Sequence, residues 1–167
     1  EGAELMHGAV LDFVALHAPS EPLDIVDIGG RDINGTPRHL FHRDCRWTVV
    51  DLEAGLNVDV VGDFTTLGMS QVADVVLCLE VLEHTPNVEG LVLAAMAACR
   101  PGGMVLVTAA GPGRAPHSAI DGCEVRDGEH YENVTPERLR DAITAAGTYE
   151  VFEVRQVNDD VQGVIWL

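Results

Sequence analysis

Residues 26–35 read VDIGGRDING, an apolar strand that runs directly into a glycine-bearing turn. The run that leads into the turn, residues 23–28, has the length and the β-branched composition of a buried strand. In α/β proteins, a polar turn at the carboxyl end of such a strand is the usual place for a ligand. The stretch therefore predicts the first strand of a parallel sheet together with a binding loop.

The rest of the chain continues this alternation of strand-like and helix-like segments. Further strands are expected at 46–52, 57–64, 73–79 and 104–110, and a closing hairpin at 149–157 and 161–167. This order predicts an α/β fold: a doubly wound, Rossmann-like, mostly parallel seven-stranded sheet with a C-terminal antiparallel hairpin and helices on both faces. With 167 residues, we expect a single domain over residues 1–167.

Four helices are expected between these strands. An N-terminal helix within residues 1–20 would pack across a sheet edge through Leu5, Ala9, Phe13 and Leu16. A Thr-Pro pair is typical of a helix N-cap and first turn. Such pairs predict the starts of the other three helices, at Thr36, Thr85 and Thr135.

Polar segments follow the expected strand ends and should meet at one rim of the sheet. They are residues 27–35, Asp51, Asp63, residues 80–84 and the long segment 111–134. A loop as long as the last of these is usually functional or mobile, so we expect it to cover the substrate as a lid.

The loop chemistry separates two classes of cofactor. Asp51 follows Asp27 by 24 residues and is placed to accept the hydroxyls of a ribose, as in sites for dinucleotides or for S-adenosylmethionine. A pyrophosphate favours G-x-G-x-x-G, but here Arg31 and Asn34 replace the second and third glycines. An amino-acid tail suits this loop better, because Asp27 can receive its ammonium group and Arg31 or the loop amides its carboxylate.

With these motifs the chain resembles the class I S-adenosylmethionine-dependent methyltransferases. The resemblance extends over nearly all of the chain, through IVDIGG, VVDLE, VVGDF, DVVLCLEVLEH, CRPGGMVLVT and TPERL. The loop departs from the usual acidic-x-G-x-G-x-G of that family and looks like a subgroup with G-x-R-D-x-N-G. Because Arg31 stands where the usual family loop carries a glycine, its role is the one that the resemblance defines least.

The resemblance implies a cofactor role for residues at each strand end. Asp27, Gly29 and Gly30 would line the methionine portion of S-adenosylmethionine, and Asp51 would bind its ribose. The adenine would meet Asp63 and Phe64, and the floor of the pocket would consist of Leu79 and Glu80. The remaining residues expected to contact the cofactor are Arg31, Asn34, Leu52 and His84.

Each of these residues also has a purely structural interpretation. The two glycines can serve only a tight turn, Asp51 can cap the next segment, and Asp63 can form an Asx-turn. Their joint placement at strand ends favours the cofactor.

Three histidines are candidates for a general base, which is needed when the acceptor must lose a proton. His84 follows the fourth strand, where a structural or pocket-lining role is also expected. His117 and His130 lie in the long segment, where they can equally be solvated loop residues.

The same segment holds other candidate ligands. His, Asp, Cys and Glu occur between His117 and His130, but their spacing matches no established metal pattern, so we expect no metal. A mobile acidic loop explains the stretch as well. Tyr131 or Pro116 is expected to contact the acceptor.

Composition narrows the partners and the compartment. A net charge of −17, with all ten basic residues arginine, opposes binding to nucleic acid or to an anionic membrane. The four cysteines show no CxxC spacing and the start lacks a secretion signal, so we expect a cytoplasmic protein. The acceptor is expected to be a small molecule, with selectivity aided by a homodimer or a partner subunit.

The sequence therefore predicts a methyltransferase that modifies an O or N atom of a small molecule or glycan. Two alternatives stay open: a non-catalytic cofactor-binding protein of the same fold, and a NAD-dependent oxidoreductase. The second is disfavoured by the loop and by the absence of lysine, which excludes a Tyr-x-x-x-Lys pair. DNA amino-methyltransferases tend to carry Asn/Asp-Pro-Pro-aromatic where this chain reads LEVL.

Overall fold

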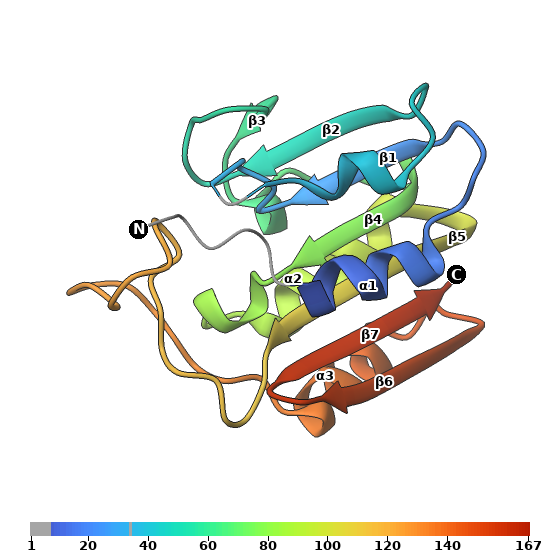
Figure 1. Cartoon of the computed structure of the whole chain (residues 1–167). Coiled ribbons are helices and arrows are strands. Elements are labelled where there is room, and N and C mark those ends of the chain that lie inside the picture. The colour runs from blue at the N-terminus through green and yellow to red at the C-terminus, as the bar shows by residue number, and fades with distance from the viewer. Residues whose placement is uncertain (1–7, 34) are drawn as a thin grey trace.

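The structure, a computed structural model, describes residues 8–33 and 35–167 (Figure 1). Three α-helices, seven strands and three short 3-10 turns alternate along these residues. In chain order they are α1 Gly8–His17, β1 Asp24–Ile28, η1 Pro37–Leu40, β2 Arg46–Asp51, β3 Val60–Val61, η2 Phe64–Thr66, β4 Ala73–Leu79, η3 Leu82–His84, α2 Val88–Ala98, β5 Cys99–Ala110, α3 Pro136–Ala146, β6 Val151–Val157 and β7 Asp160–Trp166.

The seven strands form one sheet in the order β3-β2-β1-β4-β5-β7-β6. The first five are parallel, and β7 pairs antiparallel with both β5 and β6. The chain reverses direction of winding between β1 and β4, which is where doubly wound sheets bind their ligands. The predicted fold class is confirmed.

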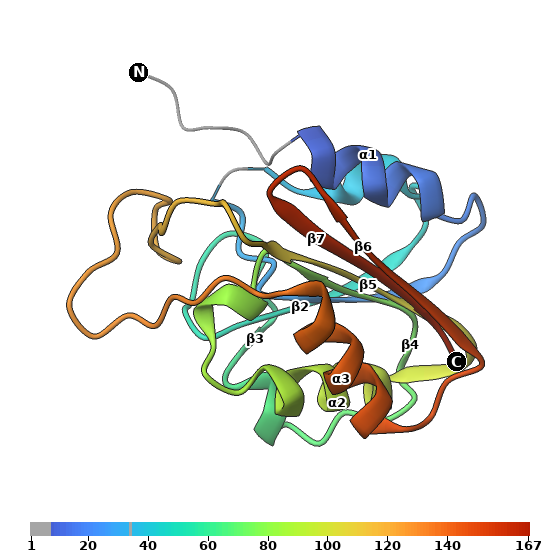
Figure 2. The same cartoon turned by 90° about the horizontal axis from the view of Figure 1, so that it is seen from below.

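Helices cover both faces of the sheet (Figure 2). On one face α2 and α3 lie side by side and bury the larger apolar core, which includes Val76, Leu139 and Ile143. On the other face α1 packs on a smaller core that includes Leu77 and Leu106. The central strands are thus shielded from water on both sides, as their continuous apolar sequence requires.

The expected contact face of the first helix was right at Phe13 and wrong at Leu16, and its expected position across a sheet edge was wrong. Its buried side chains are Val10, Phe13 and Val14, whereas Leu16 is 69% exposed and Leu5 lies outside the described residues. The helix packs on the face of the sheet instead of across an edge, because these three side chains fill the apolar surface over the central strands.

Two of the expected helix starts also differ. Residues 37–40 form only a 3-10 turn, since Phe41 is extended and the Thr36 side chain caps nothing. The cap of α2 is Asn87, whose Oδ1 accepts a hydrogen bond from Gly90 N, and Thr85 supports it by accepting from Asn87 N. The expected strand at 57–64 shortens to two residues, because the chain turns at Gly62 and Asp63 into η2.

The last helix starts and ends as expected. Thr135 Oγ1 accepts from Arg138 N at 3.1 Å, and Gly147 ends the helix with a φ of 84°. None of the described helices has the length and apolar character needed to cross a bilayer.

Candidate functional site

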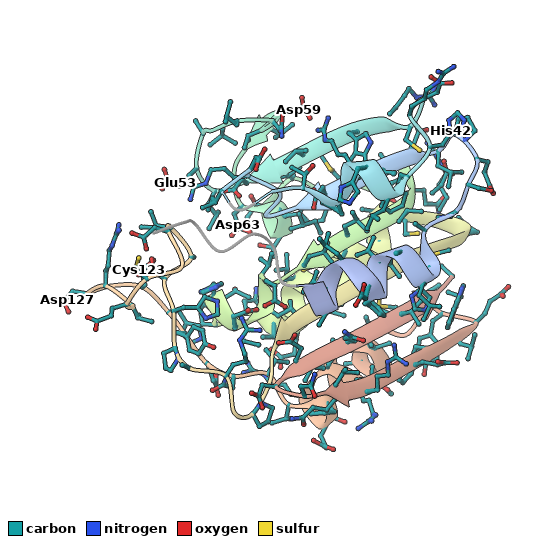
Figure 3. All side chains as sticks on the ribbon, viewed as in Figure 1. His42, Glu53, Asp59, Asp63, Cys123 and Asp127 are labelled. Atoms are coloured by element: carbon teal, nitrogen blue, oxygen red, sulfur yellow. The ribbon has the colours of Figure 1, made fainter. Side chains whose placement is uncertain are left out.

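The carboxyl ends of the five parallel strands lie at one rim of the sheet, and the segment 111–134 extends from the same rim (Figure 1). Figure 3 shows Glu53 and Asp63 at this rim, and Cys123 and Asp127 near the outer end of the segment. The sequence-predicted residues that follow strand ends are therefore gathered in one region.

Asp27 is a buried carboxyl group beside the first turn of this rim. It is the fourth residue of β1 and is 4% exposed. Burial raises its pKa to about 7; the nearby Arg38 opposes this shift and the charge of Asp51 adds to it. A Cβ at Gly30 would lie 2.4 Å from the Asp27 carboxyl carbon, so glycine is required for this close approach. The carboxyl is held tightly by the turn and remains poorly solvated.

A pocket opens directly above Asp27, at the reversal point between β1 and β4. Its lining includes five residues predicted from the sequence: Asp27, Gly29, Gly30, Arg31 and Leu79. The structure adds Gly35, which was expected at the rim but not named as a ligand contact, and two residues that the sequence reasoning missed, Thr36 and Pro37. The position of these two directly after the glycine loop was the available signal, but they were assigned to a helix start.

Asp51 joins the first two loops of the rim. One of its carboxylate oxygens accepts from Arg31 N at 3.3 Å and the other from Glu53 N at 2.9 Å. Asp51 thus caps the segment that follows it, as its structural interpretation predicts. Each of its oxygens still retains a lone pair for a ligand. The Arg31 side chain packs over Gly55, where a Cβ would meet its Cδ at 2.6 Å.

Asp63 and Phe64, expected at the adenine, and Leu52, expected elsewhere on the cofactor, do not line this pocket. Asp63 forms the Asx-turn that was its alternative interpretation, accepting from Thr65 N at 2.9 Å and from Thr65 Oγ1 at 2.7 Å. Phe64 is 5% exposed within the core, and Leu52 is 70% exposed. Asn34 lies outside the described residues.

An ion-pair cluster anchors the segment 111–134 to the sheet. Arg114 Nη1 lies 3.4 Å from Glu80 Oε2 and also forms an ion pair with Asp160, the first residue of β7. The side chains of Arg114, Glu80 and Asp160 are only 17%, 19% and 8% exposed. Glu80, expected in the pocket floor, therefore connects the end of β4 to the segment.

Four side chains from η3 and the segment form a second group at the rim, which we call the Glu83 cluster: Glu83, His84, His117 and Tyr131. The rings of His84, His117 and Tyr131 stack edge to face with centroids 5.0 to 5.6 Å apart. Beneath them Glu83 is fully buried and accepts from Ala110 N at 3.1 Å. Its Oε1 lies 4.0 Å from His117 Nε2.

The electrostatics of this cluster follow from its burial. Burial and the charge of Glu80 raise the pKa of Glu83. Burial and the neighbouring His117 lower the pKa of His84 to about 4, so His84 is neutral at pH 7. A neutral imidazole can accept a proton or bind a metal ion.

His130 is set apart from the other two predicted histidines. Its Nε2 is buried without a hydrogen-bond partner among the described residues and lies 4.0 Å from Glu132 Oε2. The structure thus packs the rings of His84 and His117 against each other, while His130 contacts His84 through a main-chain hydrogen bond and acts on it electrostatically.

The segment 111–134 is fixed at its base. Val134 N donates to Ala110 O, and Glu132 N donates to Glu83 O, both at 2.9 Å. The Asn133 amide donates to Gly111 O at 2.7 Å. The two ends of the segment therefore meet beside the Glu83 cluster.

Comparisons of the structure with solved structures agree with the fold. A Burkholderia thailandensis 1,6-didemethyltoxoflavin-N1-methyltransferase, solved with that compound and S-adenosylhomocysteine, gives a TM-score of 0.65 at 17% identity over 96% of this chain and 76% of its own. Human N-acetylserotonin methyltransferase, in complex with SAM, gives a TM-score of 0.62 at 18% identity. The match covers 95% of this chain and 50% of the human enzyme. The [4+2]-cyclase SpnF gives a TM-score of 0.59 at 17% identity, and the match covers 89% of this chain and 58% of SpnF.

At such identities the likeness shows the fold alone, and the chain spans only half the length of the human enzyme. No curated protein sequence matches the chain. A family model described as a methyltransferase domain, however, matches residues 3–154. The predicted resemblance and its cofactor, S-adenosylmethionine, are confirmed at the level of the family: the chain belongs to the methyltransferase-domain family.

Proposed function

We propose that this chain is an active methyltransferase that transfers the methyl group of S-adenosylmethionine to an O or N atom of a small molecule or glycan. The observation that carries the proposal is the shared rim: a glycine-walled pocket over the buried Asp27 and the Glu83 cluster both follow the carboxyl ends of parallel strands. One part suits a charged amino-acid tail, and the other suits an acceptor that must lose a proton.

The residues of the pocket fit the cofactor. Asp27 offers a buried carboxylate for the ammonium group, and Gly30 leaves room for close approach. Asp51 offers lone pairs to the ribose hydroxyls, and Leu79 lines the pocket wall. When bound, S-adenosylmethionine supplies a methyl group activated by its sulfonium.

The acceptor is proposed to lie under the segment 111–134, against the rings of His117 and Tyr131. Holding the acceptor atom close and aligned provides much of the acceleration in such a displacement. The proton of the acceptor leaves to one of the two clustered imidazoles, His84 or His117. A partner subunit or second copy and a cytoplasmic location remain proposals.

One specific comparison supports an alternative without methyl transfer. SpnF, which shares the fold, is described as a cyclase and not as a methyltransferase. Binding of the cofactor therefore does not by itself establish transfer, and the test of function requires turnover.

The test measures binding and turnover on the same protein. We expect calorimetry to show saturable binding of S-adenosylhomocysteine, no binding of NAD, and at least tenfold weaker binding by Asp51→Ala. Transfer from methyl-labelled S-adenosylmethionine to a panel of small hydroxyl and amine compounds should then give labelled product. Binding of S-adenosylhomocysteine without methyl transfer to any compound of the panel would favour the non-catalytic alternative. Binding of NAD alone would favour the oxidoreductase.

The affinity for S-adenosylhomocysteine should depend on pH through Asp27. Only the ionised carboxyl pairs with an ammonium group, and a pKa of about 7 leaves most chains protonated at pH 6. We therefore expect affinity to fall about tenfold from pH 8 to pH 6. Calorimetry at both pH values measures it, and Asp27→Asn should abolish the difference. If the affinity of Asp27→Asn falls as much between pH 8 and pH 6 as that of the unchanged protein, a group other than Asp27 causes the pH dependence.

A further inference from the structure

The Glu83 cluster contains buried polar atoms that the fold does not satisfy. Glu83 is fully buried, and its Oε2 has no hydrogen-bond partner among the described residues. The Nδ1 atom of His84 is likewise buried and has no hydrogen-bond partner among the described residues. Leaving such atoms without partners costs free energy, and the cost is larger for a charged group than for a neutral one. Two of them in adjacent residues at a functional rim point to a ligand.

The ligand atoms of this cluster converge. One ligand atom each from Glu83, His84 and His117 lies within 4.8 Å of the other two. Around a metal ion with bonds of about 2.0 to 2.2 Å, such atoms are about 3 to 4.4 Å apart. A small contraction of the cluster is therefore enough to bring all three to a single ion.

We propose that Glu83, His84 and His117 bind one divalent transition-metal cation at the acceptor side of the cofactor pocket. Two imidazoles and one carboxylate favour ions such as Zn²⁺, Co²⁺ or Mn²⁺ over Ca²⁺ and Mg²⁺, which prefer all-oxygen sites. Three protein ligands also leave positions open for water or an acceptor, as catalytic metal sites require.

The sequence had pointed away from a metal because the 117–130 stretch was considered by itself. Only His117 of that stretch belongs to the cluster. The other two ligands come from η3, directly after β4, and the fold brings them together with His117. The metal-binding hypothesis thus depends on a juxtaposition that spacing along the chain does not reveal.

The consequence for chemistry rests on the proposed function. A cation at this position accepts an acceptor hydroxyl as a ligand and lowers its pKa, so that its proton passes to solvent water. The two histidines then serve as ligands and not as bases. Glu83 follows Leu79 of the pocket by four residues, and the side chain of Val81 between them packs over Gly29 of the same pocket. The ion would thus lie on the side of the pocket that the proposed function assigns to the acceptor.

The binding test uses the full chain, stripped of metal by a chelator and titrated with Co²⁺. Visible ligand-field absorption reports nitrogen and oxygen coordination directly, without acceptor or turnover. We expect saturation at one ion per chain with micromolar or tighter affinity, in 150 mM salt and a large excess of Ca²⁺. The salt and Ca²⁺ suppress loose binding to a surface of net charge −17.

Substitutions assign the ligands. Glu83→Gln and His117→Ala should each weaken Co²⁺ binding at least tenfold, while still binding S-adenosylhomocysteine as evidence of an intact fold. His42→Ala and Glu153→Gln are the matched controls, since His42 lies at the opposite end of the sheet and Glu153 is exposed on β6 (Figure 3). Both controls should bind Co²⁺ like the unchanged protein.

Two results would overturn the metal site: no saturable binding of a single ion, or equal affinity in Glu83→Gln and His117→Ala. The outcome is separable from that of the proposed function. Methyl transfer by metal-free protein, with no Co²⁺ binding, would leave the methyltransferase and remove the metal. Specific Co²⁺ binding with no transfer would leave the metal site and remove the proposed activity.

Discussion

Asp27→Ala is expected to weaken binding of S-adenosylhomocysteine by about 100-fold. Asp27 is 4% exposed and faces the glycine-walled pocket, so an ammonium group that reaches it forms a charge pair shielded from water. Removing one partner of such a pair typically costs about 2 to 5 kcal/mol, and 2.7 kcal/mol corresponds to 100-fold. Isothermal titration at pH 8, where the carboxyl is mostly ionised, measures the loss.

The fold of this variant should be preserved. Burial of the Asp27 carboxyl raises its pKa and thus disfavours its charged form, so its removal relieves an electrostatic cost. Asp12→Ala provides the matched control, because Asp12 is exposed on α1 and belongs to none of the segments that form the rim. An Asp27→Ala protein that binds within threefold of the unchanged chain would show that the ammonium is held elsewhere.

Arg114→Ala is expected to lower the free energy of unfolding by about 3 to 5 kcal/mol. The guanidinium lies between Glu80 and Asp160, whose side chains are only 19% and 8% exposed, and both would be left buried near Glu83 without their cation. For a domain of this size the loss corresponds to roughly 6 to 20 °C in the melting temperature. Urea unfolding followed by circular dichroism measures it.

A matched control identifies the cause. Arg43, which is 89% exposed beside Asp44, serves as the control. Its replacement by alanine should change stability by less than about 0.5 kcal/mol. A deficit of that size in Arg114→Ala would mean that the ion-pair cluster contributes little.

The sequence predicted well what depends on local pattern. The strand before Asp27, the turn at Gly29 and the cap at Thr135 are each determined by residues that are close in the chain. The apolar run at 73–79 likewise required burial on both faces, and β4 lies at the centre of the sheet. These features allowed the fold class and five of the eight residues that line the pocket over Asp27 to be predicted.

The parts that failed depend on contacts between distant segments. Glu83 is one of 27 acidic residues, and only its hydrogen bond from Ala110 and its burial under His117 distinguish it. The Arg114 ion pairs require β7 to return beside β5, which no local spacing indicates. The contact face of α1 was misassigned because the pattern included Leu5 and Leu16, although the sheet selects Val10 and Val14.

The tied base of the segment 111–134 has an evolutionary consequence. Because main-chain bonds at Ala110 and Glu83 hold both ends, changes in length or composition near Cys123 and Asp127 alter only the outer part of the loop. The entropy of closing such a loop rises slowly with its length, so insertions there cost little stability. Descendants of this fold can therefore diversify the outer loop, which the proposed function assigns to the acceptor, without altering the pocket at Asp27.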